Sequence, residues 1–103
     1  MQVDNANPME KINPEELEDQ EVEYSGGTDI PARVILFDDE WHTFEQVTEQ
    51  IIIAIKCNLQ QAESLTWMVH SKGKALVYKG DMGECLKVSE VLEEIDLGTR
   101  VEY

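Results

Sequence analysis

Basic side chains are scarce in this sequence. Its 103 residues contain 8 lysines and arginines against 22 aspartates and glutamates, and the formal net charge at pH 7 is −14. Phosphate backbones and anionic lipid surfaces repel a protein this acidic. The composition therefore argues against a nucleic-acid partner and against a membrane partner.

Long apolar runs are absent as well. No stretch approaches the roughly 20 apolar residues of a membrane-spanning helix. The first eleven residues lack the basic flank and the apolar stretch of a signal peptide. We therefore expect a cytoplasmic protein, and a chain of 11.8 kDa has room for a single folded domain.

The sequence motifs of several enzyme classes are missing. Neither GxGxxG nor GxxxxGK[ST] occurs, and there is no GxSxG elbow, so a phosphate-binding loop and a serine hydrolase are disfavoured. The two cysteines, Cys57 and Cys85, have no CxxC or CxxH spacing and fall on or beside apolar helix faces. We interpret both as inert structural thiols.

Charge divides the chain into two parts. Residues 1–31 hold nine acids and one base, a net charge of −8, whereas residues 32–103 carry −6 in more than twice the length. The first part has too few apolar residues to offset the entropy of ordering it. We predict a flexible, disordered acidic N-terminal extension at residues 1–31 and a folded core domain at residues 32–103. The extension is either a solubilising tail or an arm that contacts a partner.

Apolar spacing in the second part first predicts a strand and then a helix. Residues 33–37 form a short β-prone apolar run just after a proline. Thr43, with Gln46 three residues later, has the pattern of a capping box that begins a helix. Apolar residues then recur at helical spacing, and the helix is expected to end at residues 56–58.

The same reading continues to the end of the chain. A second helix is predicted over residues 60–72, stopped by Gly73, and a second strand over residues 74–78. Gly80-Asp81 opens a third helix that we expect to run to Gly98, and residues 99–103 form a last strand. The order β-α-α-β-α-β predicts an α+β fold, a three-stranded sheet packed against three helices with one sheet face solvated.

An acidic triplet, Asp38-Asp39-Glu40, lies between the first strand and the first helix. Binding residues concentrate in such rigidly held loops, and the residues alone leave three interpretations open. The loop is a solvated turn near a helix dipole, or a metal site completed by His42 and His70, or a site for an ammonium group. In the third case an apolar wall stands beside it, formed by Phe44, Val47 and Val69.

Other aromatic and imidazole side chains have a plain structural interpretation. His70 ends an apolar helix stripe, where a lone histidine is more often structural than functional. Trp41 and Trp67 are likewise more often packing residues than platforms for a ligand.

Two segments in combination carry a family likeness. They are Val34-Ile-Leu-Phe-Asp-Asp-Glu-Trp-His-Thr-Phe-Glu-Gln-Val47 and, about twenty residues later, Met68-Val-His-Ser-Lys-Gly-Lys-Ala75. Together they resemble ClpS, the adaptor family of the ATP-dependent Clp protease. The likeness runs from about Arg33 to Val101, and the acidic extension falls where that family has a variable N-terminal extension.

The resemblance implies a non-enzymatic protein without metal or cofactor. Its expected role is to bind proteins by a free, bulky hydrophobic N-terminal residue and to deliver them to a ClpA- or ClpC-type AAA+ unfoldase with ClpP. A monomer is expected. The fold that the resemblance implies, a three-stranded sheet with three helices, agrees with the order deduced from the spacing.

Site residues follow from the resemblance position by position. It assigns the substrate's α-amino group to Asp38, Asp39 and His70, and a possible contact with the unfoldase to Lys87. The hydrophobic pocket that it implies is lined by His42, Phe44, Val47, Thr66 and Val69. Several of these positions depart from the family pattern, because Asp38 replaces an asparagine, His42 replaces a threonine, and Phe44 and Thr66 stand where methionines are common.

Two other classes of function compete with the adaptor. One is a small metal-dependent enzyme that uses Asp38, Asp39, His42 and His70. The other is a structural subunit whose acidic surface docks a basic partner.

Overall fold

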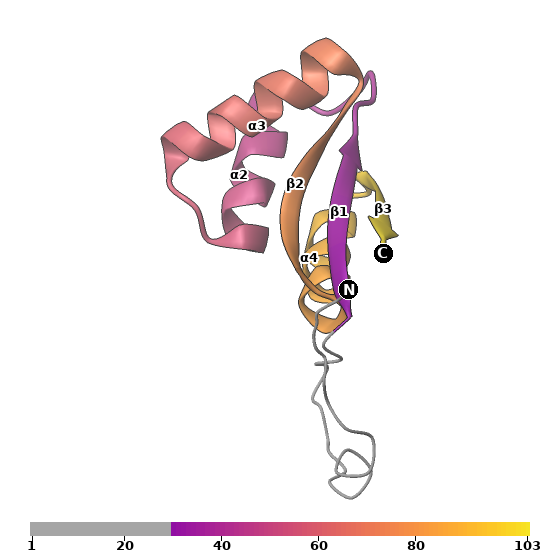
Figure 1. Cartoon of the computed structure of the whole chain (residues 1–103). Helices are drawn as coiled ribbons and strands as arrows, with labels where there is room; N and C mark the ends of the chain where they lie inside the picture. Colours follow the sequence, from indigo (N-terminus) through magenta and orange to yellow (C-terminus); the bar gives the residue numbers. More distant parts are fainter. Residues whose placement is uncertain (1–29) are drawn as a thin grey trace, which may run out of the picture.

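The computed structural model describes residues 30–103, and the elements follow one another as β1, α2, α3, β2, α4 and β3 (Figure 1). Their bounds are β1 Pro31–Phe37, α2 Phe44–Ile55, α3 Leu59–Lys72, β2 Lys74–Asp81, α4 Met82–Glu93 and β3 Gly98–Glu102. The predicted order and the α+β class are confirmed. The predicted extension lies outside the described residues up to residue 29, and Pro31 already belongs to β1.

β1 is the central strand of the sheet. The spatial order is β2-β1-β3, and both neighbours run antiparallel to β1. The register against β2 shifts between Val34, which pairs with Tyr78, and Ile35, which pairs with Leu76. This bulge places one extra residue, Val77, in β2 and changes which β2 side chains share a face with β1.

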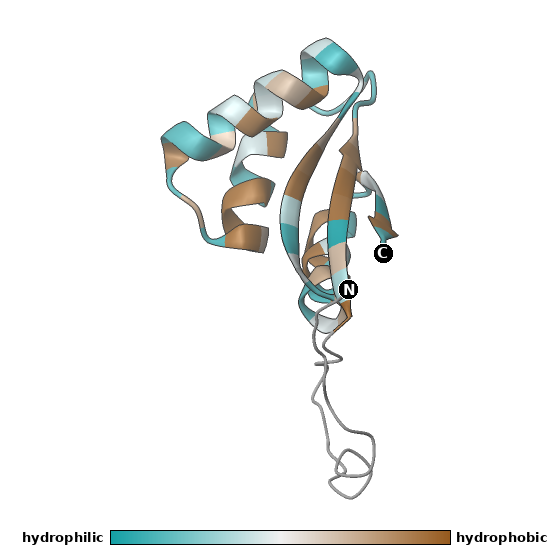
Figure 2. Ribbon diagram, viewed as in Figure 1, coloured by the Kyte–Doolittle hydropathy of each residue, from teal (hydrophilic) through white to brown (hydrophobic). Residues whose placement is uncertain are grey.

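One face of the sheet carries the core. Ala32, Val34 and Leu36 alternate with exposed or half-buried residues along β1, and Ala75 and Val77 do the same in β2. Hydrophobic residues accordingly dominate the middle of both strands (Figure 2). All three helices contribute to the layer over this face, and α4 contacts every strand.

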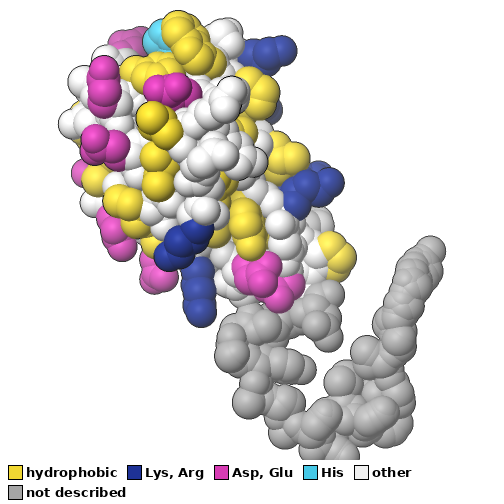
Figure 3. Space-filling view, turned by 90° about the vertical axis from the view of Figure 1, so that its left-hand side faces the viewer, with side chains coloured by type: hydrophobic (Ala, Val, Ile, Leu, Met, Phe, Trp, Pro, Cys, Tyr) yellow, Lys and Arg dark blue, Asp and Glu magenta, His cyan; other side chains and the backbone are white. Residues whose placement is uncertain are grey.

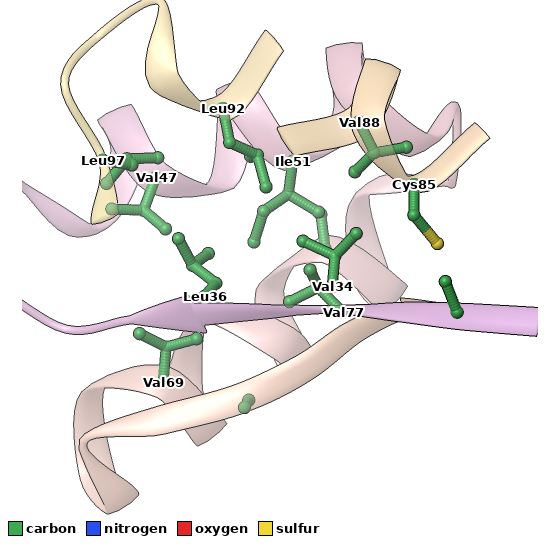
Figure 4. Close-up of a cluster of buried hydrophobic side chains, with 13 residues drawn as sticks. Val34, Leu36, Val47, Ile51, Val69, Val77, Cys85, Val88, Leu92 and Leu97 are labelled. Carbon is green, nitrogen blue, oxygen red and sulfur yellow. The ribbon is translucent and has the colours of Figure 1, made fainter. Parts of the chain in front are cut away.

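Side chains from α2 and α4 meet those of β1 in the interior. Val47 and Ile51 of α2 point toward Leu36 and Val34, with Leu92 of α4 beside them (Figure 4). Burying an aliphatic side chain of this size contributes roughly 1.5–3 kcal/mol. This packing fixes α2 over the end of β1, which is where the acidic loop begins.

The helix starts obey local capping chemistry. Thr43 accepts a hydrogen bond from the Gln46 amide while the Gln46 side chain accepts one from the Thr43 amide, so the predicted capping box is confirmed. Asp81 and Glu84 make the same reciprocal pair at α4. Among the helices of the described part, none combines the length and the apolar character that a membrane crossing requires.

The prediction that the third helix continues to Gly98 was wrong. α4 ends at Glu93, and a turn follows in which Asp96 adopts the left-handed conformation, with φ 66°. Aspartate tolerates that conformation better than most residues. The turn directs Leu97 into the core, where it is 4 % exposed, and Gly98 opens β3 instead of ending a helix.

Candidate functional site

The loop between β1 and α2 is fixed at its first residue by the end of α3. The Asp38 amide donates to the Gly73 carbonyl, 2.9 Å away, and the Gly73 amide donates to the Val69 carbonyl. Gly73 has a φ of 88°, so it supplies the left-handed cap that ends the helix without a Cβ penalty. The carboxylate of Asp38 and the last turn of α3 therefore lie side by side.

Asp39 organises the rest of the loop. Its Oδ1 accepts hydrogen bonds from the backbone amides of Trp41 and His42, and its Oδ2 lies 2.6 Å from His42 Nδ1. Burial raises the pKa of Asp39, but the hydrogen bonds from His42 and Trp41 outweigh it and hold that pKa below its ordinary value. Asp39 is thus a carboxylate whose two oxygens are occupied within its own loop.

His42 joins this loop to the turn after α4. Its side chain is 2 % exposed, and its Nε2 lies 2.5 Å from the Ile95 carbonyl while Nδ1 faces Asp39. Both partners are acceptors, so the ring satisfies both only when each nitrogen carries a proton. Burial lowers the pKa of His42, but the bonds to Asp39 and Ile95 outweigh it, and the pKa is raised. We call this arrangement of Asp39, His42 and the Ile95 carbonyl the histidine clasp.

A pocket of about 320 Å³ opens beside the clasp, between the loop, α2 and α3. Its lining consists of Asp38, His42, Thr43, Phe44, Val47, Thr66, Trp67, Val69 and His70. Seven of these nine positions were singled out from the sequence as site residues, and the fold brings them together. Asp39 and Lys87 are not among them.

The polar end of the pocket is formed by Asp38 and His70. His70 Nδ1 lies 3.7 Å from Asp38 Oδ1, and both side chains are reachable by solvent, at 65 % and 34 % exposure. Within residues 30–103 no lysine or arginine forms an ion pair with Asp38. Its carboxylate is consequently free to accept hydrogen bonds from a cationic ligand.

The remainder of the pocket is apolar. The Phe44 and Trp67 rings pack with centroids 5.2 Å apart, and Val47 and Val69 are buried behind them. The hydroxyl of Thr66 donates to the Ala62 carbonyl and also meets the Thr48 hydroxyl at 2.8 Å. Because its hydroxyl is satisfied inside the core, Thr66 offers the pocket only its hydrocarbon surface.

Two lining residues were not predicted as site residues. Thr43 was read only as a helix cap, which it is, but its place in the loop also puts it at the pocket edge. Trp67 was read as a packing residue, yet it is 58 % exposed and stands between Phe44 and His70, with its ring centroid 6.2 Å from that of His70. The signal available in the sequence was its spacing, because a residue three positions before His70 shares a helix face with it.

The four side chains of the metal hypothesis form two separate pairs. Asp39 is paired with His42, and Asp38 with His70. Among residues 30–103, no three His, Cys, Asp or Glu side chains are grouped so that they could hold a metal ion. Both ring nitrogens of His42 already face oxygen acceptors, which leaves that residue without a lone pair to donate.

The family model of the ATP-dependent Clp protease adaptor protein ClpS matches residues 28–97, and the chain belongs to this family. No curated protein matches the sequence. Among solved structures, that of Agrobacterium tumefaciens ClpS2 bound to L-phenylalaninamide is similar, with a TM-score of 0.68 and 15 % identity over 73 % of this chain and 98 % of that chain. At this level of sequence identity, the structural similarity shows that the two proteins share a fold.

The histidine clasp predicts a stability that depends on pH. Its contribution is complete below the pKa of histidine in the unfolded chain, about 6.5, and is lost as pH rises through the higher pKa of folded His42. His42→Gln should lower the free energy of unfolding by about 2 kcal/mol at pH 6, because two charge-assisted hydrogen bonds are weakened. The loss relative to the wild type should shrink at pH 9.

Urea unfolding of both proteins at the two pH values measures this difference. His70→Gln, a change at the exposed histidine, is the matched control for the substitution. If His42→Gln lowers the free energy of unfolding equally at pH 6 and pH 9, the interpretation that both ring nitrogens of His42 are protonated would be contradicted.

Proposed function

We propose that this chain is an adaptor without catalytic activity, which binds proteins by a free N-terminal residue with a bulky hydrophobic side chain. The observation that carries the proposal is the pairing, in one pocket, of an anionic end at Asp38 and His70 with an apolar end at Phe44, Val47 and Val69. A free N-terminal residue has the matching pattern, an ammonium group next to a side chain. Membership of the ClpS family and the phenylalaninamide on the similar ClpS2 support the same ligand class.

The anionic end accounts for recognition of the amino group. We propose that the ligand's ammonium group donates to Asp38 and packs beside His70. Asp38 Oδ1 and His70 Nδ1 lie 3.7 Å apart, so one ammonium group can contact both side chains. Hydrogen bonds with a charged donor and acceptor are stronger than neutral ones. Asp39, whose oxygens accept hydrogen bonds within the loop, contributes by its charge.

The apolar end accounts for the preference for large side chains. A pocket of about 320 Å³ accommodates an aromatic or leucine side chain. Burying one contributes roughly 1.5–3 kcal/mol. Neither end alone gives specificity, because many peptides offer a buried side chain or a charge but only a chain terminus offers both at this spacing.

Delivery is the second half of the proposal. We propose that the bound substrate is passed to a ClpA- or ClpC-type AAA+ unfoldase with ClpP, and that the adaptor works as a monomer. Lys87 stands on the exposed side of α4, in a shallow hollow shared with Leu86, Glu90 and Glu93. This hollow has no lining residue in common with the ligand pocket.

The free amino group should be indispensable. N-acetylation of a leucine-starting peptide removes the ammonium and should weaken binding by about 2 kcal/mol or more, as should Asp38→Ala. Fluorescence anisotropy with peptides that differ only at their first residue measures both effects. Glu40→Ala, which removes a neighbouring carboxylate outside the pocket lining, is the control.

Two results would count against this assignment. Equal affinities for the free and the acetylated peptide would exclude recognition of the terminus. Equal losses in Asp38→Ala and Glu40→Ala would reduce the role of Asp38 to general charge attraction.

Phe44 should act as the selectivity gate. A β-branched first residue, isoleucine or valine, is widest next to its backbone, where we propose that the Phe44 ring meets it. Leucine and phenylalanine widen deeper in the pocket. The wild type should therefore disfavour isoleucine relative to leucine by roughly 1–3 kcal/mol. Phe44→Ala should reduce that difference, with little loss for phenylalanine.

The ratio of isoleucine to leucine affinity is the decisive measurement. Trp67→Ala is the matched control, because Trp67 contributes the other ring of the wall and should weaken all peptides alike. An unchanged ratio in Phe44→Ala would mean that another residue sets the selectivity.

Lys87 should matter for delivery and not for peptide binding. Lys87→Glu reverses the charge in the α4 hollow, which should slow degradation of a leucine-starting model substrate by the cognate unfoldase and protease while peptide affinity is unchanged. Lys56→Glu, a change at the exposed lysine that ends α2, controls for the shift in net charge. Equal degradation rates in the two variants would remove Lys87 from the proposed contact.

A further inference from the structure

The sheet face turned away from the helices is built from three cross-strand rows. Across β2, β1 and β3 the rows are Lys79–Arg33–Glu102, Leu76–Ile35–Arg100 and Lys74–Phe37–Gly98. Directly opposed residues on neighbouring strands share a face of the sheet. Four cations, one carboxylate and three apolar side chains therefore lie together on what we call the open face.

The open face has the opposite charge from the rest of the molecule. It holds four of the seven basic residues in the described part of the chain but only one of its thirteen acids. On the helical side, by contrast, acidic side chains are spread over the surface (Figure 3). In a protein of net charge −14, a cationic sheet face is a strong local departure.

The existing ion pairs leave this face positive. Glu102 forms ion pairs with both arginines, in which its carboxylate oxygens lie 3.1 Å from Arg33 Nε and 2.7 Å from Arg100 Nη2. The Arg100 guanidinium also lies 5.4 Å from the centre of the Phe37 ring. Lys74 and Lys79 form no ion pair with any other residue of the described part.

The chain itself contains a segment of matching chemistry. Residues 15–23 read Glu-Glu-Leu-Glu-Asp-Gln-Glu-Val-Glu, six acids among nine residues. The segment ends eight positions before Pro31, where β1 begins, and Ser25-Gly26-Gly27 between them permits a reversal of direction. From the Arg33 row to the Phe37 row the open face extends about 13 Å, which nine extended residues span easily.

We propose that residues 15–23 dock across the open face of the sheet. In an extended segment, residues 15, 17, 19, 21 and 23 share one side. The carboxylates on that side pair with Lys74, Lys79 and the two arginines, while Leu17 has apolar partners in Ile35 and Leu76. The tether through residues 24–30 makes the contact intramolecular, with an effective concentration on the order of millimolar. The proposal does not depend on the adaptor function, and the ligand pocket shares no residue with the open face.

Paramagnetic broadening in the full chain tests the docking. A nitroxide is attached at Gln20→Cys, which changes no charge, in a Cys57→Ser background, while the fully buried Cys85 is retained. The methyl groups of Ile35 and Leu76 report on the open face. The exposed methyl groups of Ile53 and Leu59, on α2 and α3, report on the helical side.

At 50 mM salt, the Ile35 and Leu76 methyl signals should be broadened at least about twofold more than those of Ile53 and Leu59. The excess should vanish at 500 mM salt, where the Debye length falls to about 4 Å. The excess should also fall in Lys74→Gln/Lys79→Gln, and it should persist in the control Lys56→Gln/Lys87→Gln, which removes the same charge elsewhere.

Three results would overturn the proposal. One is equal broadening of the methyl groups on both sides of the molecule. Another is an excess at the open face that neither salt nor the lysine changes alter, which would make the contact non-ionic. The third is broadening that arises between molecules, seen when a spin-labelled copy is mixed with an unlabelled copy whose methyl groups are observed. That result would assign the face to dimerisation.

Discussion

The doubly hydrogen-bonded ring of His42 is the contact on which the geometry of the site depends. It links the Asp39 turn, which leads directly into α2, to the turn that carries Ile95, 53 positions further along the chain. A nearly fully buried imidazolium is costly unless both protons find acceptors. Here both ring nitrogens face acceptors, and these two hydrogen bonds restrain the loop that forms the rim of the pocket.

A second contact ties the rim to the opposite wall. The hydrogen bond from the Asp38 amide to the Gly73 carbonyl joins the end of β1 to the cap of α3, the helix that bears Thr66, Val69 and His70. The carboxylate of Asp38 thereby stands near the His70 ring without either side chain being buried. Backbone geometry, more than side-chain packing, keeps the anionic end solvent-accessible and in place.

Features that local chemistry decides were predictable from the sequence, whereas features that distant contacts decide were not. The capping box at Thr43 and the glycine cap at Gly73 follow from residues within one helical turn, and both were predictable. The end of α4 was not, because the apolar rhythm continues to Ile95 while the chain turns to bury Leu97. The second partner of His42 was equally invisible, since the Ile95 carbonyl lies 53 positions away.

The two ends of the pocket rest on different parts of the fold. The anionic end is set by the loop and its clasp, whereas the apolar end is set by side chains on α2 and α3 that face one another across the pocket. Exchanging Phe44 or Thr66 changes the shape of the apolar end without touching the hydrogen bonds of Asp38, Asp39 or His42. In the proposed adaptor, such a separation lets the apolar end set the preference for a side chain independently of the hydrogen bonds that hold the anionic end.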